Sequence, residues 1–173
     1  MSQIKVDSIV PRGGLPGGAT GGGIIQCVQT VKTDTWSAYS NGSETALAGL
    51  SVTITPQSAS NKILLISSLF YSCYQTTYGF YYKRGSTIVG LGDAANNQQR
   101  VHGGLGHTYD ANQCDQCTTY WIDSPGTTSA TTYTLYMKND NTRVMYINRS
   151  QNDQNNNTGK RGMSTVTAME VSV

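Results

Sequence analysis

The sequence predicts an all-β domain, a jelly-roll-like β-sandwich that follows an extended N-terminal arm. One apolar run, residues 63–70, is too short to span a membrane and is bounded by turn-like residues, as is typical of a buried strand. Short segments rich in β-branched and aromatic residues recur along the chain between turn signals. No segment has a convincing helical pattern, so a sandwich or jelly roll is the expected architecture.

The strands follow from these patterns in chain order. We expect them at residues 24–31, 50–55, 63–70, 79–83, 87–90, 117–122, 131–137, 144–148 and 164–171. The apolar run is expected to be the central strand, covered on both faces, and residues 50–55 to be half-buried with a hydroxyl-rich outer face. Residues 84–86 are expected to form the turn of a hairpin, and residues 34–44 a loop or hairpin. Residues 92–109 and 150–160 are expected to be loops.

The composition limits the classes of protein to consider. A chain of 173 residues is long enough for one domain with a substantial core, here residues 24–173. Charged residues make up only 13%, against about 25% in an average protein, so hydroxyl and amide side chains must form most of the polar surface. The net charge is +2 and the basic residues form no stripe, which argues against nucleic-acid binding. No secretory signal or membrane-spanning run is visible, so membrane insertion is not expected.

Residues 1–23 form a separate unit, the predicted anchoring arm. Its first part carries the apolar residues Ile4, Val6, Ile9 and Val10, and residues 11–23 are rich in glycine and proline. Such a segment cannot bury enough apolar surface to fold alone. A disordered linker is one interpretation; we favour an arm that docks on a neighbouring protein, because its apolar head would otherwise stay exposed.

Candidate chemical groups are sparse, and we predict no catalytic site, metal or cofactor. Cys114 and Cys117 have the spacing of half a zinc site, with His102 and His107 upstream, but no second close pair completes it. Free thiols or disulfides remain open for the cysteines; a core of this size does not require disulfides, and the lack of a visible secretory signal favours thiols. No pair of carboxylates can be singled out for glycan hydrolysis and no nucleophile elbow is present.

The most uneven feature is a tyrosine-rich stretch. Tyr71, Tyr74, Tyr78, Tyr81 and Tyr82 lie within twelve residues of one another. Tyrosine joins a flat apolar face to a polar tip, which suits sugar stacking or a protein interface, so these residues are the candidate receptor or interface surface. The alternative is that some of them form the core and cross-strand pairs.

Several segments together resemble the tail-fibre and virion appendage proteins of tailed phages, especially phages of marine cyanobacteria. The resemblance rests on residues 4–11, 23–26, 28–35, 49–56 and 62–65, and on residues 123–125, 146–150 and 165–171. It implies a homotrimeric jelly-roll-like head, an N-terminal anchor to other virion proteins and a role in host attachment, with host surface glycan as a partner. It carries no catalytic residues.

Other functions fit the same residues. The chain is short and lacks heptads or a repetitive shaft, so a trimeric tail knob or a protein on the capsid surface is also consistent with it. The main alternative is a capsid decoration or cement protein that binds neighbouring capsid subunits, and the third is a glycan-degrading tailspike. In each case the expected location is the virion surface, after assembly in the host cytoplasm.

Overall fold

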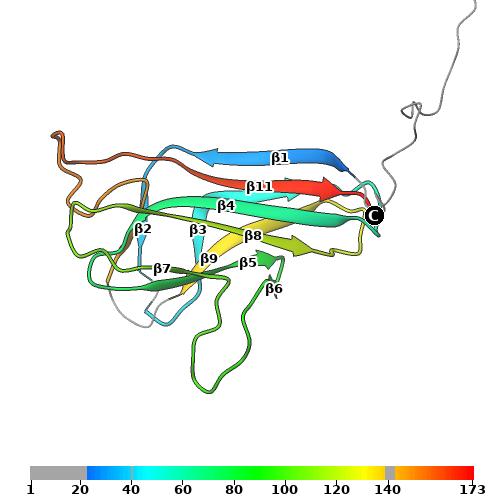
Figure 1. Cartoon of the computed structure of the whole chain (residues 1–173), viewed down its shortest axis with the longest axis horizontal. Coiled ribbons are helices and arrows are strands. Elements are labelled where there is room, and N and C mark those ends of the chain that lie inside the picture. The colour runs from blue at the N-terminus through cyan, green and yellow to red at the C-terminus, as the bar shows by residue number, and fades with distance from the viewer. Residues whose placement is uncertain (1–22, 40, 139–142) are drawn as a thin grey trace, which may run out of the picture.

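The computed structural model describes residues 23–39, 41–138 and 143–173, and this part of the chain is all β (Figure 1). Eleven strands and no helix occur within these ranges. The strands form two sheets that pack as a sandwich, which confirms the predicted fold class. The predicted anchoring residues Ile4, Val6, Ile9 and Val10 lie outside the described residues.

The first sheet is built around β4 (Lys62–Ser72). β11 (Ser164–Val171) pairs with one edge of β4 and β8 (Asp115–Asp123) with the other, and β1 (Ile24–Lys32) pairs with the far edge of β11. The short β10 (Met145–Ile147) pairs with the last residues of β4, on the same edge as β11 and beyond the point where β11 begins. β10 also pairs with β2 (Trp36–Ala38). All these pairings are antiparallel.

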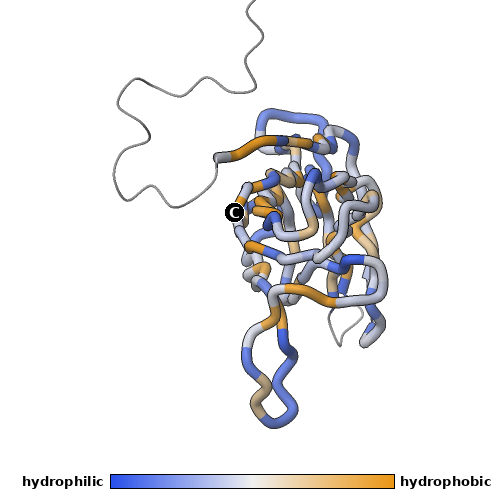
Figure 2. Tube along the Cα trace, turned by 90° about the vertical axis from the view of Figure 1, so that its right-hand side faces the viewer, coloured by the Kyte–Doolittle hydropathy of each residue, from blue (hydrophilic) through white to orange (hydrophobic). Residues whose placement is uncertain are grey.

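The second sheet has β9 (Thr131–Lys138) between β3 (Thr45–Ile54) and β5 (Tyr78–Arg84). Two short strands, β6 (Thr87–Val89) and β7 (Gly103–Leu105), share the other edge of β5. The predicted hairpin is confirmed as β5 and β6, with Gly85 in the left-handed region (φ 59°) that the tight turn requires. The loop between β6 and β7 projects from the sandwich and is largely hydrophilic (Figure 2).

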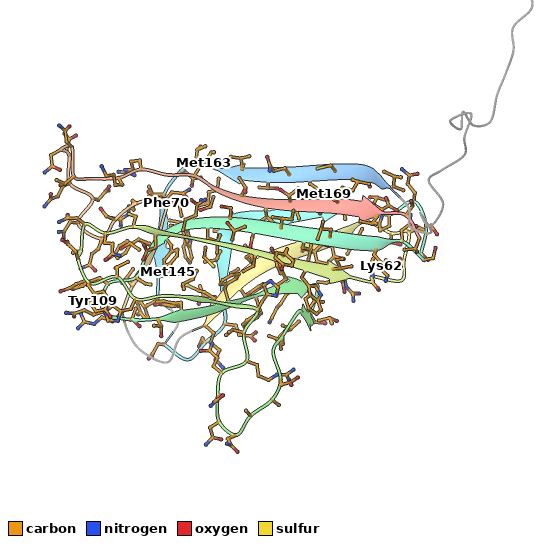
Figure 3. All side chains as sticks on the ribbon, viewed as in Figure 1. Lys62, Phe70, Tyr109, Met145, Met163 and Met169 are labelled. Carbon is orange, nitrogen blue, oxygen red and sulfur yellow. The ribbon has the colours of Figure 1, made fainter. Side chains whose placement is uncertain are left out.

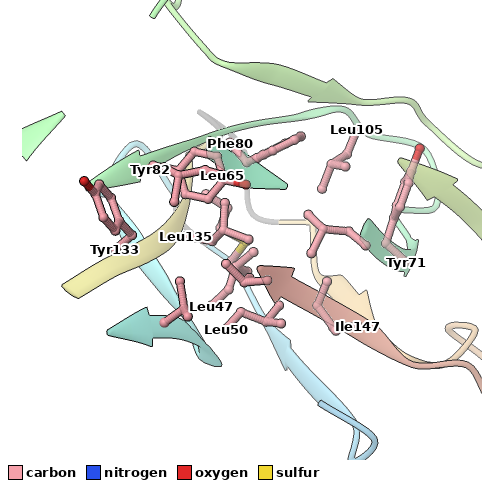
Figure 4. Packing of buried hydrophobic residues seen from close by; sticks show 14 of the residues in the cluster. Leu47, Leu50, Leu65, Tyr71, Phe80, Tyr82, Leu105, Tyr133, Leu135 and Ile147 are labelled. Carbon is pink, nitrogen blue, oxygen red and sulfur yellow. The ribbon is translucent and has the colours of Figure 1, made fainter. Parts of the chain in front are cut away.

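The core lies between the sheets because alternate residues of each strand point inward. Leu50, Val52 and Ile54 of β3 are buried while Ser51 and Thr53 face outward, as predicted. They belong to one core cluster with Leu65 from β4 and Leu135 from β9, and Figure 4 shows Leu50, Leu65 and Leu135 in this cluster. Burial of these aliphatic and aromatic side chains supplies the main driving force for folding, at about 25 cal/mol per Å² of apolar surface.

The structure corrects one expectation about the central strand. β4 is central, with three strands along its two edges, but its faces are not equally covered. Ile63, Leu65 and Leu69 are fully buried, whereas Leu64 and Ile66 on the other face are only half-buried. The edges of β4 are occupied, but no second layer of the described chain lies over its outer face.

Two short strands lie outside the set of predicted strands. β2 lies within residues 34–44, the expected loop or hairpin, and β7 lies within the expected loop 92–109. Each has three residues, and each exists because it pairs with a strand that is distant in sequence, β10 or β5. The part of the chain that is described contains no helix long and apolar enough to cross a membrane.

Candidate functional site at the loop end

Three loops gather at one end of the sandwich, here called the loop end (Figure 1). They are residues 73–77 between β4 and β5, residues 106–114 between β7 and β8, and residues 148–163 between β10 and β11. The loops are rich in amide and hydroxyl side chains. Figure 3 places Tyr109 at this end and Lys62 at the opposite one.

Backbone hydrogen bonds tie the three loops together. The Gln75 amide donates to the Thr108 carbonyl (3.2 Å), and the Thr108 amide donates to the Cys73 carbonyl (3.1 Å). The Asn152 amide donates to the Ala111 carbonyl (3.1 Å), which joins the second loop to the third. The loop end is thus a connected surface built from segments far apart in sequence.

Asn148 fixes the base of the longest loop. It is fully buried and has a positive φ of 64°, a conformation that asparagine tolerates better than most residues. Its Nδ2 donates to the carbonyls of Lys32 (2.8 Å) and Asp34 (2.9 Å), and its Oδ1 accepts from the Ser164 hydroxyl (2.7 Å). One side chain therefore joins β11 and the β1–β2 turn to the point where the loop leaves β10.

Charged groups in the same loop are used internally. The Asp153 carboxylate pairs with Arg161 (2.8 Å) and lies 3.7 Å from Arg149. The Arg149 guanidinium also lies over the Tyr146 ring, 4.4 Å from its centroid. Gly162 ends the loop close to Phe70, since a Cβ there would lie 2.4 Å from the ring. These contacts hold the loop in one shape.

The groups that remain at the surface suit recognition of a hydroxyl-rich ligand. The Tyr109 side chain is 82% exposed and its ring centroid lies 4.2 Å from that of His107. The neighbouring amides are ordered by internal hydrogen bonds: the Asn152 Nδ2 donates to the Asn112 Oδ1 (3.1 Å), and the Asn112 Nδ2 donates to the Asp110 carboxylate (3.1 Å). An exposed aromatic face beside amides can stack on a sugar ring and pair with its hydroxyls.

The predicted arm joins the domain at the opposite end. The Ser172 amide donates to the Gly23 carbonyl (3.2 Å), so the beginning and the end of the described domain lie side by side. β1 starts beside the C-terminus, away from the three loops (Figure 1). The domain therefore has two different ends, one where the preceding residues join it and one formed by polar loops.

No protein-family model matches this chain, and no curated protein does. The resemblance to phage appendage proteins therefore stays a prediction, and the function must be argued from the geometry.

The structure corrects the predicted tyrosine surface. Tyr71, Tyr78, Tyr81 and Tyr82 are buried, so they cannot form a receptor surface in this fold. Tyr78 and Tyr82 point between the sheets, and Tyr81 lies under Tyr136, with nearly parallel rings 6.4 Å apart. The alternative of core and cross-strand pairs thus holds: Tyr71, Tyr78 and Tyr82 belong to the core cluster, and Tyr81 forms a cross-strand pair.

Tyr74 is the exception among the predicted tyrosines. It is half-buried, forms an isolated bridge with Thr108, and accepts a hydrogen bond from Gln75 Nε2 (3.0 Å) at its hydroxyl. It belongs to the loop end. Sequence reasoning missed Tyr109, whose neighbours give no periodic signal, although it did identify the amide-rich loop at residues 150–160.

The weak metal candidates are not brought together. His102 packs among the rings of Phe80, Tyr82 and Trp121, and its Nδ1 lies 2.9 Å from the Gly90 carbonyl oxygen. His107 lies beside Tyr109 instead. No group of three or more His, Cys, Asp or Glu side chains in the described ranges is placed to hold a metal ion. The four cysteines are free thiols in this structure.

Asp123 has a structural role in the described chain. It pairs with the Arg84 Nε (2.8 Å) and accepts from the Tyr133 hydroxyl (2.7 Å), which links β8 to the second sheet. Burial, together with this carboxylate, raises the pKa of Tyr133 well above its ordinary value. The interaction connects the two sheets at the end of the sandwich opposite the loop end.

A hollow of about 340 Å³ lies beside the projecting loop. Several of its polar groups are already engaged in hydrogen bonds or ion pairs, and two of these bonds involve residues of that loop. Gln99 Nε2 donates to the Lys138 carbonyl (3.1 Å), Arg100 Nε donates to the Gly92 carbonyl (2.7 Å), and Glu44 pairs with Lys83. The lining residues are Glu44, Tyr81, Ile88, Leu91, Asn97, Gln98, Gln99, Arg100 and Lys138.

Proposed function

We propose that this chain is a homotrimeric attachment protein on the virion of a tailed phage. The segment before Ile24 anchors it to other virion proteins, and the loop end contacts glycan on the host surface. The proposal combines the resemblance carried by the sequence segments with the arrangement of the described domain.

The observation that carries the proposal is the opposition of the two ends. Gly23 and Ser172 meet at one end, and the loops at residues 106–114 and 148–163 lie at the other. An attachment protein needs this polarity, because the surface that reaches the host must lie away from the surface that holds the particle.

The chemistry of the loop end supports a glycan ligand. Neutral sugars offer hydroxyl groups and apolar ring faces, and amides pair with hydroxyls in both directions because they donate and accept. Tyr109 provides an exposed ring, while the nearby Asp153 is already paired with arginine. The hydrogen bonds between the loops also reduce the entropy that binding would cost.

Competition with phage adsorption tests the proposal. The purified full chain, added in excess to host cells, is expected to slow adsorption of the phage that encodes it. Tyr109→Ala should raise the half-competing concentration about 30-fold, since loss of a central aromatic contact costs about 2 kcal/mol. The matched control is Tyr39→Ala, because Tyr39 is 57% exposed and lies outside the three loops.

Other outcomes separate the alternative functions. Absence of competition at saturating protein would contradict attachment. If the labelled chain then bound phage capsids, a decoration protein would be favoured. Release of soluble sugar from host glycan would instead indicate a degrading tailspike.

A further inference from the structure

The outer face of the first sheet is an apolar feature that the described chain leaves partly uncovered. It consists of the outward residues of four antiparallel strands, all described in full. We call this set the outer face: Cys27, Gln29, Val31, Lys62, Leu64, Ile66, Ser68, Phe70, Gln116, Thr118, Tyr120, Ile122, Thr165, Thr167, Met169 and Val171.

The strand register arranges these residues in rows across the sheet. In one row Cys27 lies opposite Met169, Met169 opposite Leu64, and Leu64 opposite Ile122. The next row runs from Gln29 through Thr167 and Ile66 to Tyr120 by the same pairings. Side chains opposite each other across antiparallel strands are in contact range, so the apolar residues form a continuous patch.

This patch is open to solvent in the single chain. Tyr120 is 76% exposed and Ile122 is 53% exposed, and both lie on β8 at the edge of the sheet. The part near Phe70 is covered by the close approach of Gly162, and Thr167 in the middle of the sheet is buried by its neighbours. Contiguous apolar surface of this kind on a soluble domain marks an interaction site.

The charge and hydrogen-bonding pattern of the outer face suits contact with another copy of this chain. Lys62, at one end, is the single charged residue of the outer face. Two identical faces that meet bring like charges together, so a nearly uncharged face avoids the repulsion that would oppose self-association. Its polar members are amides and hydroxyls, which both donate and accept, and they can therefore pair with an identical set.

We propose that the outer face packs against the outer faces of the other copies of this chain in the homotrimer proposed above, on which this inference rests. The apolar rows form the centre of the contact, and Gln29, Thr118 and Thr165 lie among its polar groups. The exposed Cys27 lies within the contact and becomes covered on association.

Molecular mass in solution tests this inference. Light scattering after size exclusion should give the wild-type chain three times the single-chain mass of 18.6 kDa. Ile122→Lys places like charges at the contact and should raise the dissociation constant at least about 100-fold, so that the variant elutes as a single chain. Tyr120→Lys is a second variant at a more exposed position, in case the first fails to fold.

Thr132→Lys is the matched control. Thr132 is exposed on the outward side of β9, in the second sheet, so the same charge there should leave the mass unchanged. Circular dichroism checks that each variant is folded. A trimeric mass that survives both outer-face substitutions would contradict the proposal, as would loss of the trimeric mass in Thr132→Lys.

A wild-type chain that is monomeric throughout would also contradict it. Removal of residues 1–22 would then distinguish two other occupants of the outer face, the chain's own leading segment and a different protein. Alkylation of Cys27 that is faster in the shortened chain than in the full chain would assign the face to the leading segment. Unchanged, rapid alkylation would assign it to a different protein. A monomeric chain that still competes for adsorption would overturn this inference but leave attachment standing.

Discussion

The two sheets bury similar inner faces but differ in what they turn outward. The second sheet presents hydroxyls and lysines: Thr53 bonds to Thr132 across β3 and β9 (2.7 Å), and Lys83 lies over the Tyr136 ring, 4.7 Å from its centroid. The first sheet presents Leu64, Ile66 and other apolar residues with almost no charge. The difference indicates that the outward face of the second sheet is exposed to solvent, and it fits the proposal that the outer face of the first sheet contacts protein.

Adjacent leucines on β4 give the largest contrast. Leu65→Ala removes a fully buried inner side chain and should lower the free energy of unfolding by about 2–5 kcal/mol, since a cavity remains. Leu64→Ala on the outer face should cost less than about 1.5 kcal/mol in the monomeric Ile122→Lys background, because less of that side chain leaves water. Urea unfolding of both variants measures this.

Leu64→Ala, measured in two backgrounds, tests whether the outer face is covered in the oligomer. With an otherwise wild-type outer face, the cost of Leu64→Ala should increase, since the side chain is then buried by another copy. If Leu64→Ala lowers the free energy of unfolding equally in the two backgrounds, the outer face is not covered by another copy.

A smaller effect is expected at high pH, from the inner face of the second sheet. Burial raises the pKa of Tyr82 to about 12, from an ordinary value near 10. Between pH 10 and 12 the folded state therefore holds more protons than the unfolded state. The stabilisation is present below pH 10 and is lost as the pH rises toward 12, at up to about 1.4 kcal/mol per pH unit for one group.

Urea midpoints between pH 9 and 12 check this expectation. Tyr82→Phe should flatten the decline, and Tyr71 and Tyr78, whose pKa values burial also raises to about 12, should retain part of it. A slope that is the same with and without the Tyr82 hydroxyl would be inconsistent with its burial between the sheets.

Much of the fold could be predicted because it depends on local patterns. Alternation of apolar and hydroxyl residues predicts the second half of β3, and the turn around Gly85 predicts the β5–β6 hairpin. β2 and β7 were not among the predicted strands, because three residues are too few to show an alternation of apolar and polar side chains. They are strands because they pair with β10 and β5, which are distant in sequence.

The candidate site was less predictable, for a different reason. A row of tyrosines has the same composition whether it faces water or the core, and burial of Tyr78 and Tyr82 depends on packing against the first sheet. The loop end joins residues 73–77, 106–114 and 148–163, which no local pattern connects. The exposed apolar rows likewise require the register of four strands before they can be seen.

Alkylation of Cys27 as a function of protein concentration tests the central claim most directly. Cys27 is the exposed thiol among the four cysteines, whereas burial raises the pKa of Cys73 to about 12 and that of Cys114 to about 11, which slows their reaction near pH 8. If a second copy covers the outer face, the Cys27 rate should fall as concentration rises and should stay constant in Ile122→Lys. A wild-type rate that is rapid and independent of concentration would contradict the account.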